Sequence, residues 1–187
     1  MYEREIKALT SLPYGWDRLN GKTILISGGT GLIGSLFLDV LRERNRKFGQ
    51  HIRAICLSRS PKNSDETVTY RAADVINKFD IEEHFDYCIH LASNTHPKQY
   101  AEDPVGTIET NILGCLNLLE ICRSRGGVSR FLLASSVEIY GDGDGVPMKE
   151  DFCGKIDCNT ARAGYNESKR LCESWCSHIV CNTVWIA

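Results

Sequence analysis

Short apolar runs alternate with amphipathic stretches along most of the chain. The runs at 23–27, 52–57, 68–70, 87–90, 131–135 and 183–187 are rich in branched or aromatic residues and predict buried strands. Helical periodicity follows at 32–41, 104–125 and 164–179. Strands that alternate with helices over short connections predict an α/β fold, a Rossmann-type doubly wound parallel sheet.

The same periodicity predicts which helix positions face the core. On the first helix these are Leu32, Ile33, Leu36, Phe37, Val40 and Leu41, and on the second Ile108, Ile112, Leu116 and Leu119. Residues 1–20 carry turn-forming residues and predict an N-terminal extension, followed by one dinucleotide-binding domain over 21–187. Because the sequence stops on an apolar strand, we expect a truncated protein that lacks a C-terminal substrate domain.

Composition narrows the class of protein without identifying it. The chain has 187 residues, 42% of them hydrophobic, and a net charge of -2, which offers no field for nucleic acid or an anionic membrane. No apolar run approaches the roughly 20 residues of a membrane span, and the N-terminus is not a signal peptide, so we expect a cytoplasmic protein. Nine cysteines, an odd number without metal-ligand spacing, predict neither a disulfide framework nor a metal site.

A glycine-rich turn joins the first strand to the first helix. Gly28, Gly31 and Gly34 lie in the segment Ser27-Gly-Gly-Thr-Gly-Leu-Ile-Gly34. A pyrophosphate can approach bare backbone closely, and the N–H groups at the start of the helix meet its charge. A glycine triplet is a weak signal alone, but its place between strand and helix predicts a dinucleotide site.

The end of the second strand bears on which dinucleotide is bound. An acidic residue there would bind the adenosine ribose of NAD, but the sequence has Ser58 followed by Arg59. An arginine at this place can face the 2′-phosphate of NADP or stack on adenine, so NAD and NADP both remain options. Asp74, after the third strand, can accept hydrogen bonds from the adenine amine.

Tyr165 and Lys169 lie four residues apart and share one face of the third predicted helix. A nearby ammonium stabilises a phenolate, so this tyrosine can take a proton from an alcohol while hydride leaves the same carbon. Ser136 follows the fifth strand, at the edge where ligands meet an open α/β sheet. Together with the glycine turn, these residues predict an oxidoreductase-type site.

These motifs resemble those of the extended short-chain dehydrogenases/reductases, in the NAD-dependent epimerase/dehydratase family. The resemblance runs from Lys22 to Ala187 and includes His90-Leu-Ala-Ser93 and Ser135-Ser-Val-Glu-Ile-Tyr-Gly141. It implies that Ser136 orients a sugar hydroxyl, that Tyr165 is the acid/base and that Lys169 also holds the nicotinamide ribose. It also implies a cofactor-binding set of Gly28, Thr30, Gly31, Leu32, Ile33, Gly34, Ser58, Arg59, Asp74, Val75, Leu91, Ala92, Ser93, Asn111, Tyr165 and Lys169.

Within that family the sequence is most similar to the UDP-glucuronate decarboxylases. Glu138 falls where those enzymes carry a catalytic glutamate, whereas Val137 stands where the related dehydratases have a proton-donating aspartic acid. The resemblance therefore implies a nucleotide-sugar substrate that passes through a 4-keto sugar, with the cofactor regenerated in place. It also implies a homodimer that pairs through the helices at 104–125 and 164–179.

Three alternatives remain open at this stage. An epimerase would use Glu138 to remove the proton beside a C4 ketone. A simple NADP-dependent reductase is favoured by Arg59 and would consume its cofactor. A non-catalytic NAD(P)-binding module would have no need to keep Ser136, Tyr165 and Lys169 together.

Overall fold

A computed structural model describes residues 2–94, 98, 102–143, 145, 147–179 and 184–186. Six parallel strands form one sheet in the order β3-β2-β1-β4-β5-β6. They are β1 (Thr23–Ser27), β2 (Arg53–Ser58), β3 (Val68–Ala72), β4 (Tyr87–His90), β5 (Arg130–Ala134) and β6 (Val184–Ile186). The predicted parallel α/β sheet is confirmed, with strand boundaries within two residues of those expected.

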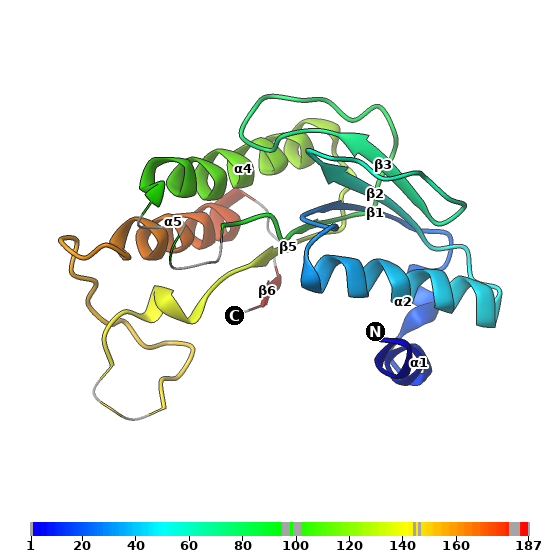
Figure 1. Ribbon diagram of the computed structural model, residues 1–187, viewed down its shortest axis with the longest axis horizontal. Helices are drawn as coiled ribbons and strands as arrows, with labels where there is room; N and C mark the ends of the chain where they lie inside the picture. The colour runs from blue at the N-terminus through cyan, green and yellow to red at the C-terminus, as the bar shows by residue number, and fades with distance from the viewer. Residues whose placement is uncertain are drawn as a thin grey trace.

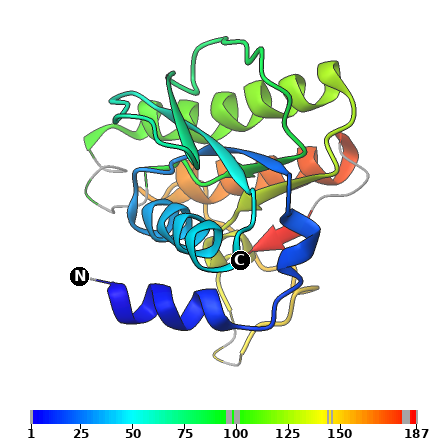
Figure 2. The same cartoon turned by 90° about the vertical axis from the view of Figure 1, so that its right-hand side faces the viewer.

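Helices cover both faces of this sheet. α1 (Glu3–Ser11) and α2 (Leu32–Phe48) lie on one side of the sheet, and α4 (Pro104–Arg125) and α5 (Ala163–Ile179) on the other (Figures 1 and 2). Two short 3-10 turns, η1 (Trp16–Leu19) and η2 (Val137–Tyr140), complete the described elements. The chain builds outward from β1 to β3 and then returns to place β4 beside β1, which creates a switch point where a crevice opens.

Each face of the sheet has its own apolar core. The cluster under α4 and α5 includes Leu25, Leu118, Leu119 and Phe131, all fully buried. The cluster under α2 includes Ile24, Ile26, Leu38 and Leu41. Because the strands are buried on both faces, they read as continuous apolar runs rather than as alternating ones.

The predicted core face of α2 was wrong in its first turn. Leu32 is 70% exposed and Ile33 is 69% exposed, whereas Leu38, which was not predicted, is fully buried. The first turn rests on the glycine turn through Gly34, whose Cα hydrogens face the backbone of Gly28 and Gly29. The side chains of Leu32 and Ile33, directly before that contact, therefore project into solvent.

α4 packs on two sides, which the single predicted face did not capture. Leu119 is fully buried, but Ile108, Ile112 and Leu116 are only half-buried, and Leu118 was missed. The helix lies against both the sheet and α5, so apolar contacts spread around more of its circumference. By length and mean hydropathy (22 residues, 1.2) α4 could also cross a membrane, contrary to our expectation from sequence, although its packing is that of a core helix.

The predicted N-terminal extension folds against α2. The guanidinium of Arg44 donates to the carbonyl of Thr10 at 2.8 Å and stacks 3.8 Å from the ring centroid of Phe48. The same guanidinium lies 5.1 Å from the Trp16 ring, so one cation joins α1, η1 and α2. These contacts hold the segment before β1 on the outer side of α2.

Removal of the Phe131 ring should show how much stability the core beneath α4 and α5 supplies. Phe131 is fully buried, so we expect Phe131→Ala to lower the free energy of unfolding by about 3–5 kcal/mol through lost burial and a residual cavity. Val105→Ala, at a side chain 63% exposed, should change it by less than about 0.5 kcal/mol. Urea unfolding measures both, and equal losses would contradict the assigned core.

Candidate functional site

The carboxyl ends of the parallel strands meet at one edge of the sheet. β1 ends at Ser27 and β4 at His90, and these two residues are partners in the strand register. β2 ends at Ser58 and β5 at Ala134. Most of the residues predicted for the site follow one of these strand ends, so the sheet gathers side chains far apart in sequence.

The glycine turn packs directly on the segment after β4. Gly28 has a φ of +74°, and a Cβ at this position would lie 2.7 Å from the backbone nitrogen of Ala92. A Cβ on Gly34 would collide with the carbonyl oxygen of Gly28. Both positions therefore require glycine because the backbones approach too closely for any side chain.

The turn leaves the start of α2 open to an anion. Gly31 is the N-cap residue, and no side chain caps the helix there. The first turn carries no acidic residue, so the N–H groups and the positive end of the helix dipole have no carboxylate partner at this end of α2. This arrangement suits a pyrophosphate.

A cavity of about 530 Å³ opens beside the turn. Ten of the residues predicted to bind the cofactor line it: Gly28, Thr30, Gly31, Ser58, Arg59, Asp74, Val75, Leu91, Ala92 and Ser93. Bare backbone, a helix N-terminus and flanking polar side chains together fit a dinucleotide. The side chains of Leu32 and Ile33 are exposed instead, Gly34 lies under the turn, and Asn111, Tyr165 and Lys169 do not line this cavity.

Ser27 and His90 form a buried polar contact where β1 and β4 end side by side. The Ser27 hydroxyl lies 2.6 Å from Nδ1 of His90 and accepts the backbone N–H of Ala92 at 3.4 Å. The buried hydroxyl and the imidazole thus satisfy each other away from water. Burial lowers the pKa of His90 to about 3, and the charge of Lys169 adds to this effect.

A chain of hydrogen bonds links the cavity wall to α5. Ser93 Oγ donates to Asn111 Oδ1 at 2.7 Å, and Asn111 Nδ2 donates to Ser168 Oγ at 2.8 Å. The Ser168 hydroxyl in turn donates to the carbonyl of Tyr165 at 2.8 Å. Asn111 and Ser168 are both buried, so this connection is shielded from water.

Tyr165 and Lys169 are buried one helical turn apart on α5. Their exposed fractions are 6% and 3%, and the Lys169 ammonium lies 5.9 Å from the centroid of the Tyr165 ring. Lys169 Nζ donates to the carbonyl of Ala134, at the end of β5, at 2.9 Å. Burial lowers the pKa of Lys169. A buried lysine beside a buried tyrosine is costly to maintain and is typical of a functional site.

Ser136 and Glu138 lie on η2, directly after β5. Ser136 caps this turn and its hydroxyl accepts the N–H of Glu138 at 3.3 Å. The Glu138 carboxylate forms an ion pair with Arg162, just before α5. The neighbouring Ser135 hydroxyl is buried and has no hydrogen-bond partner among the described residues. The segment therefore holds a carboxylate and two hydroxyls near the Tyr165 end of α5.

Several residues of the site were missed at the sequence level. Lys62, Ser60 and Thr110 line the cavity. Arg170 donates from Nε and Nη2 to the carbonyl of Ile139 and also reaches the carbonyl of Gly154, which fastens η2 to α5. The signal for Arg170 was its place directly after Lys169, but its carbonyl partners depend on the fold.

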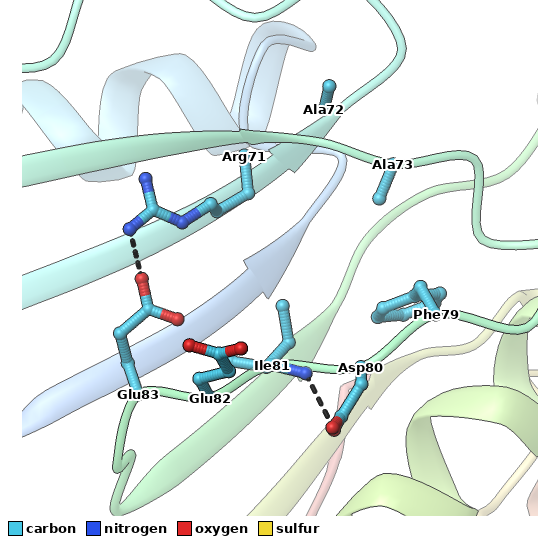
Figure 3. A pocket seen from close by; sticks show the side chains of 8 residues that line it. All are labelled: Arg71, Ala72, Ala73, Phe79, Asp80, Ile81, Glu82 and Glu83. Atoms are coloured by element: carbon cyan, nitrogen blue, oxygen red, sulfur yellow. Dashed lines mark hydrogen bonds and ion pairs between the residues drawn. The ribbon is translucent and has the colours of Figure 1, made fainter.

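A second cavity lies on the side of the edge strand β3. It has a volume of about 510 Å³ and is lined by Arg71, Ala72, Ala73, Phe79, Asp80, Ile81, Glu82 and Glu83. Figure 3 shows Arg71 and Glu83 pointing toward each other as an ion pair, while the N–H of Ile81 donates to the Asp80 carboxylate. None of the predicted site residues lines this second cavity, so we place the functional site at the cavity beside the glycine turn.

The cysteines within the described ranges are all free thiols, and most of them are buried. Cys115 and Cys176 approach to 4.0 Å between α4 and α5, where they pack in the core. Over the same ranges, no group of three histidine, cysteine, aspartate or glutamate side chains is placed to hold a metal ion.

Comparison with known proteins identifies the family of this chain independently of the site geometry. Residues 24–182 match the model of the NAD dependent epimerase/dehydratase family. The chain is 33% identical over 160 residues to UDP-glucuronic acid decarboxylase 1 of Danio rerio, covering 83% of this chain and 37% of that protein. UDP-glucuronic acid decarboxylase 3 of Arabidopsis thaliana is 35% identical over 155 residues, covering 81% and 44%. The chain thus spans less than half the length of these relatives.

Solved structures agree on the fold. The UDP-glucose 4-epimerase of Thermus thermophilus, in complex with NAD, is 26% identical with a TM-score of 0.62, covering 83% of this chain and 50% of that chain. An epimerase of Methanothermobacter thermautotrophicus is 25% identical with a TM-score of 0.71, covering 93% and 55%.

The buried His90 should make stability depend on pH in a defined window. The unfolded histidine binds a proton below about pH 6.5, whereas the folded one stays neutral down to about 3. Stability is therefore complete above pH 6.5 and falls as pH drops, by up to about 1.4 kcal/mol per unit. Asp65 and Asp86, whose pKa values are lowered by hydrogen bonds and cations against the opposing effect of burial, add their own losses only below about pH 4.

We expect His90→Asn to lower stability at pH 7 but to flatten its dependence between pH 4.5 and 6.5. Urea unfolding across this range measures the slope. His51→Asn, at an exposed histidine, serves as the control and should keep the original slope. An unchanged slope in His90→Asn would show that another group binds the proton.

Proposed function

Because the chain belongs to the NAD-dependent epimerase/dehydratase family, we propose that it is the catalytic and cofactor-binding part of a nucleotide-sugar decarboxylase acting on UDP-glucuronate or a close analogue. The observation that carries this proposal is the buried Tyr165–Lys169 pair, joined by hydrogen bonds to the wall of a cavity that fits a dinucleotide. The decarboxylases named above are the relatives that support the choice of substrate.

A nicotinamide dinucleotide bound in the cavity supplies a hydride acceptor and donor. Tyr165 takes the proton of the sugar 4-hydroxyl, and Lys169 lies one helical turn from it, with its ammonium 5.9 Å from the centroid of the tyrosine ring. Ser136 orients the hydroxyl, and the neighbouring Ser135 hydroxyl, which has no partner in the part of the chain that the structure describes, adds a donor at the same strand end. A ketone at C4 makes the C6 carboxylate a β-keto acid, which loses carbon dioxide readily.

Glu138 is the carboxylate to which we assign a role at the sugar, because two contacts fix its position. Its ion pair with Arg162 positions the carboxylate on η2, and Arg170 anchors the same turn to α5. Val137, 60% exposed, has no proton to donate, so we do not favour dehydration. An epimerase is the second candidate, because a carboxylate at Glu138 is a base of the kind that removes the proton beside a C4 ketone.

We also propose a cytoplasmic homodimer. Free thiols throughout the described chain suit a reducing compartment. α4 and α5 expose Val105, Leu113 and Leu171, which provide apolar surface for pairing with a second copy.

The catalytic assignment is tested with the gene product at full length. We expect the protein, incubated with UDP-glucuronate and NAD or NADP, to release carbon dioxide and to yield a UDP-pentose. Mass spectrometry of the reaction mixture detects both products. We expect Tyr165→Phe and Glu138→Gln each to lower kcat by about 10²–10⁴-fold, because each removes a proton-transfer group. Dinucleotide binding should stay near that of the unchanged protein.

Glu109→Gln, at an exposed carboxylate on α4, is the matched control for Glu138→Gln and should keep full activity. A product of unchanged mass but altered stereochemistry would favour the epimerase. Net consumption of NADPH would instead identify a reductase, and binding without any conversion would identify a non-catalytic module.

A further inference from the structure

Five cysteines meet in the apolar core beneath α4 and α5. Cys88 lies on β4, Cys115 and Cys122 on α4, and Cys172 and Cys176 on α5, and each is at most 5% exposed. None of the five is in a disulfide. None of them lines the cavity beside the glycine turn or takes part in the proposed chemistry. The core therefore holds a group of thiols that the proposed function leaves unused.

Two rows of side chains bring some of these thiols together between α4 and α5, which run side by side in the same direction (Figure 1). Asn111 Nδ2 donates to Ser168 Oγ at 2.8 Å, and the Cys172 thiol donates to the carbonyl of Asn111 at 3.2 Å. One turn further along, the sulfur atoms of Cys115 and Cys176 lie 4.0 Å apart. Each row advances by four residues, so a displacement at the two sulfur atoms reaches Asn111 over a single helical turn.

Small side chains let the two helices approach closely at this row. Gly164 stands one turn before Ser168, and a Cβ there would lie 2.9 Å from Cδ1 of Ile108 on α4. Closely spaced backbones are what a disulfide requires, since its Cα atoms stand about 4.4–6.8 Å apart. The distance between the sulfur atoms of Cys115 and Cys176 is about twice the length of an S–S bond, so a modest shift brings them to bonding distance.

We propose that Cys115 and Cys176 are a redox-sensitive pair, which forms a reversible disulfide under oxidation and thereby lowers the proposed activity. The effect on activity rests on the proposed function, whereas the disulfide itself does not. With hydrogen peroxide as the oxidant, the sulfur of one thiol displaces water from the peroxide and becomes a sulfenic acid. The second sulfur then attacks the sulfenic sulfur, and a second water leaves. Two thiols and one peroxide thus give one disulfide and two waters, the sulfur atoms being oxidised and the peroxide oxygens reduced.

Burial determines how this pair responds to an oxidant. Cys115 and Cys176 are fully buried, so an oxidant reaches them only when the core opens locally. Hydrogen peroxide is close to water in size and can enter through such an opening. The pair therefore stays reduced in a reducing compartment and responds to sustained exposure to peroxide.

The disulfide acts on the site through Asn111. To form the bond, the two sulfur atoms move closer by about 2 Å, and Asn111 stands one turn before Cys115 on the same helix. The Asn111 side chain joins Ser93, on the cavity wall, to Ser168 through hydrogen bonds of 2.7 and 2.8 Å. Such bonds leave the usual range of about 2.7–3.2 Å when a helix shifts by more than about 0.5 Å. A displacement of about 1 Å in a catalytic site can lower the rate about 10²-fold.

The test uses the gene product at full length, reduced and then exposed to hydrogen peroxide. The exposed Cys153 and Cys158 are replaced by serine beforehand so that they cannot react. We expect tandem mass spectrometry to find a bridge between Cys115 and Cys176, with the loss of two hydrogen atoms. Turnover of UDP-glucuronate should fall about ten- to a hundredfold and return when dithiothreitol reduces the bridge.

Cys176→Ser removes one thiol of the pair with little change in volume. It should abolish both the bridge and the sensitivity to peroxide, and leave the activity before oxidation unchanged. The matched control is Cys172→Ser, one turn away on the same face of α5, whose hydroxyl can still donate to the carbonyl of Asn111. This variant should still form the bridge and lose activity on oxidation.

Thiols that stay reduced in the folded, peroxide-treated protein would overturn the pair and show that these cysteines serve packing alone. A bridge that survives in Cys176→Ser would overturn the assignment of the two partners. A bridge that forms without loss of activity would overturn the regulation. If the bridge forms but the reduced protein converts no nucleotide sugar, the proposed function fails, and the regulation with it, while the redox pair stands.

Discussion

The contact between the glycine turn and the start of the segment after β4 is the constraint on which the site depends. Gly28 meets the backbone of Leu91 and Ala92 at a distance that excludes a Cβ, and Gly34 meets Gly28 in the same way. Any side chain at these places would push α2 away from the sheet edge. The cavity, the open helix N-terminus and the buried polar contact between β1 and β4 exist only while these backbones touch.

That close approach also explains the buried polar pair of Ser27 and His90. With β1 and β4 adjacent at their carboxyl ends, Ser27 and His90 are forced together out of reach of water. A buried hydroxyl and imidazole are stable only when they satisfy each other, and the Ala92 N–H completes the arrangement. The histidine is thereby kept neutral close to Lys169, which must itself carry a charge in a buried place.

Lys169 shows how the fold supports such a charge. Its one hydrogen bond in the described structure, to the carbonyl of Ala134, lies at the end of β5. An ammonium has three donors, and this bond satisfies one of them. The chain Ser93–Asn111–Ser168 fixes the same helix from the cavity side, so α5 is tied to the sheet edge by two independent routes. Burial without this support would favour the neutral amine.

The fold was largely predictable because its signals are local. Strand runs, helical periodicity and a glycine turn are properties of consecutive residues, and they gave the parallel sheet within two residues at the strand ends. Leu32 and Ile33 were assigned to the core wrongly because periodicity does not reveal that the first turn of α2 lies on Gly28 rather than on a strand. The Ser27–His90 pair and the carbonyl partners of Arg170 join residues 16 to 63 positions apart, and only strand register and loop path bring them together.

Under the proposed function, decarboxylation and epimerisation begin with the same step, in which Tyr165 takes the proton of the sugar 4-hydroxyl as hydride leaves the same carbon. Both reactions return that hydride, so neither consumes the cofactor. They differ in the bond that breaks while the ketone is present: the bond to the carboxylate in decarboxylation, and the C–H bond beside the ketone in epimerisation. Only the second needs a base at the ring, and Glu138, paired with Arg162 on η2, is the carboxylate that we propose for it. The two proposed reactions are therefore distinguished at η2 rather than at the cavity beside the glycine turn.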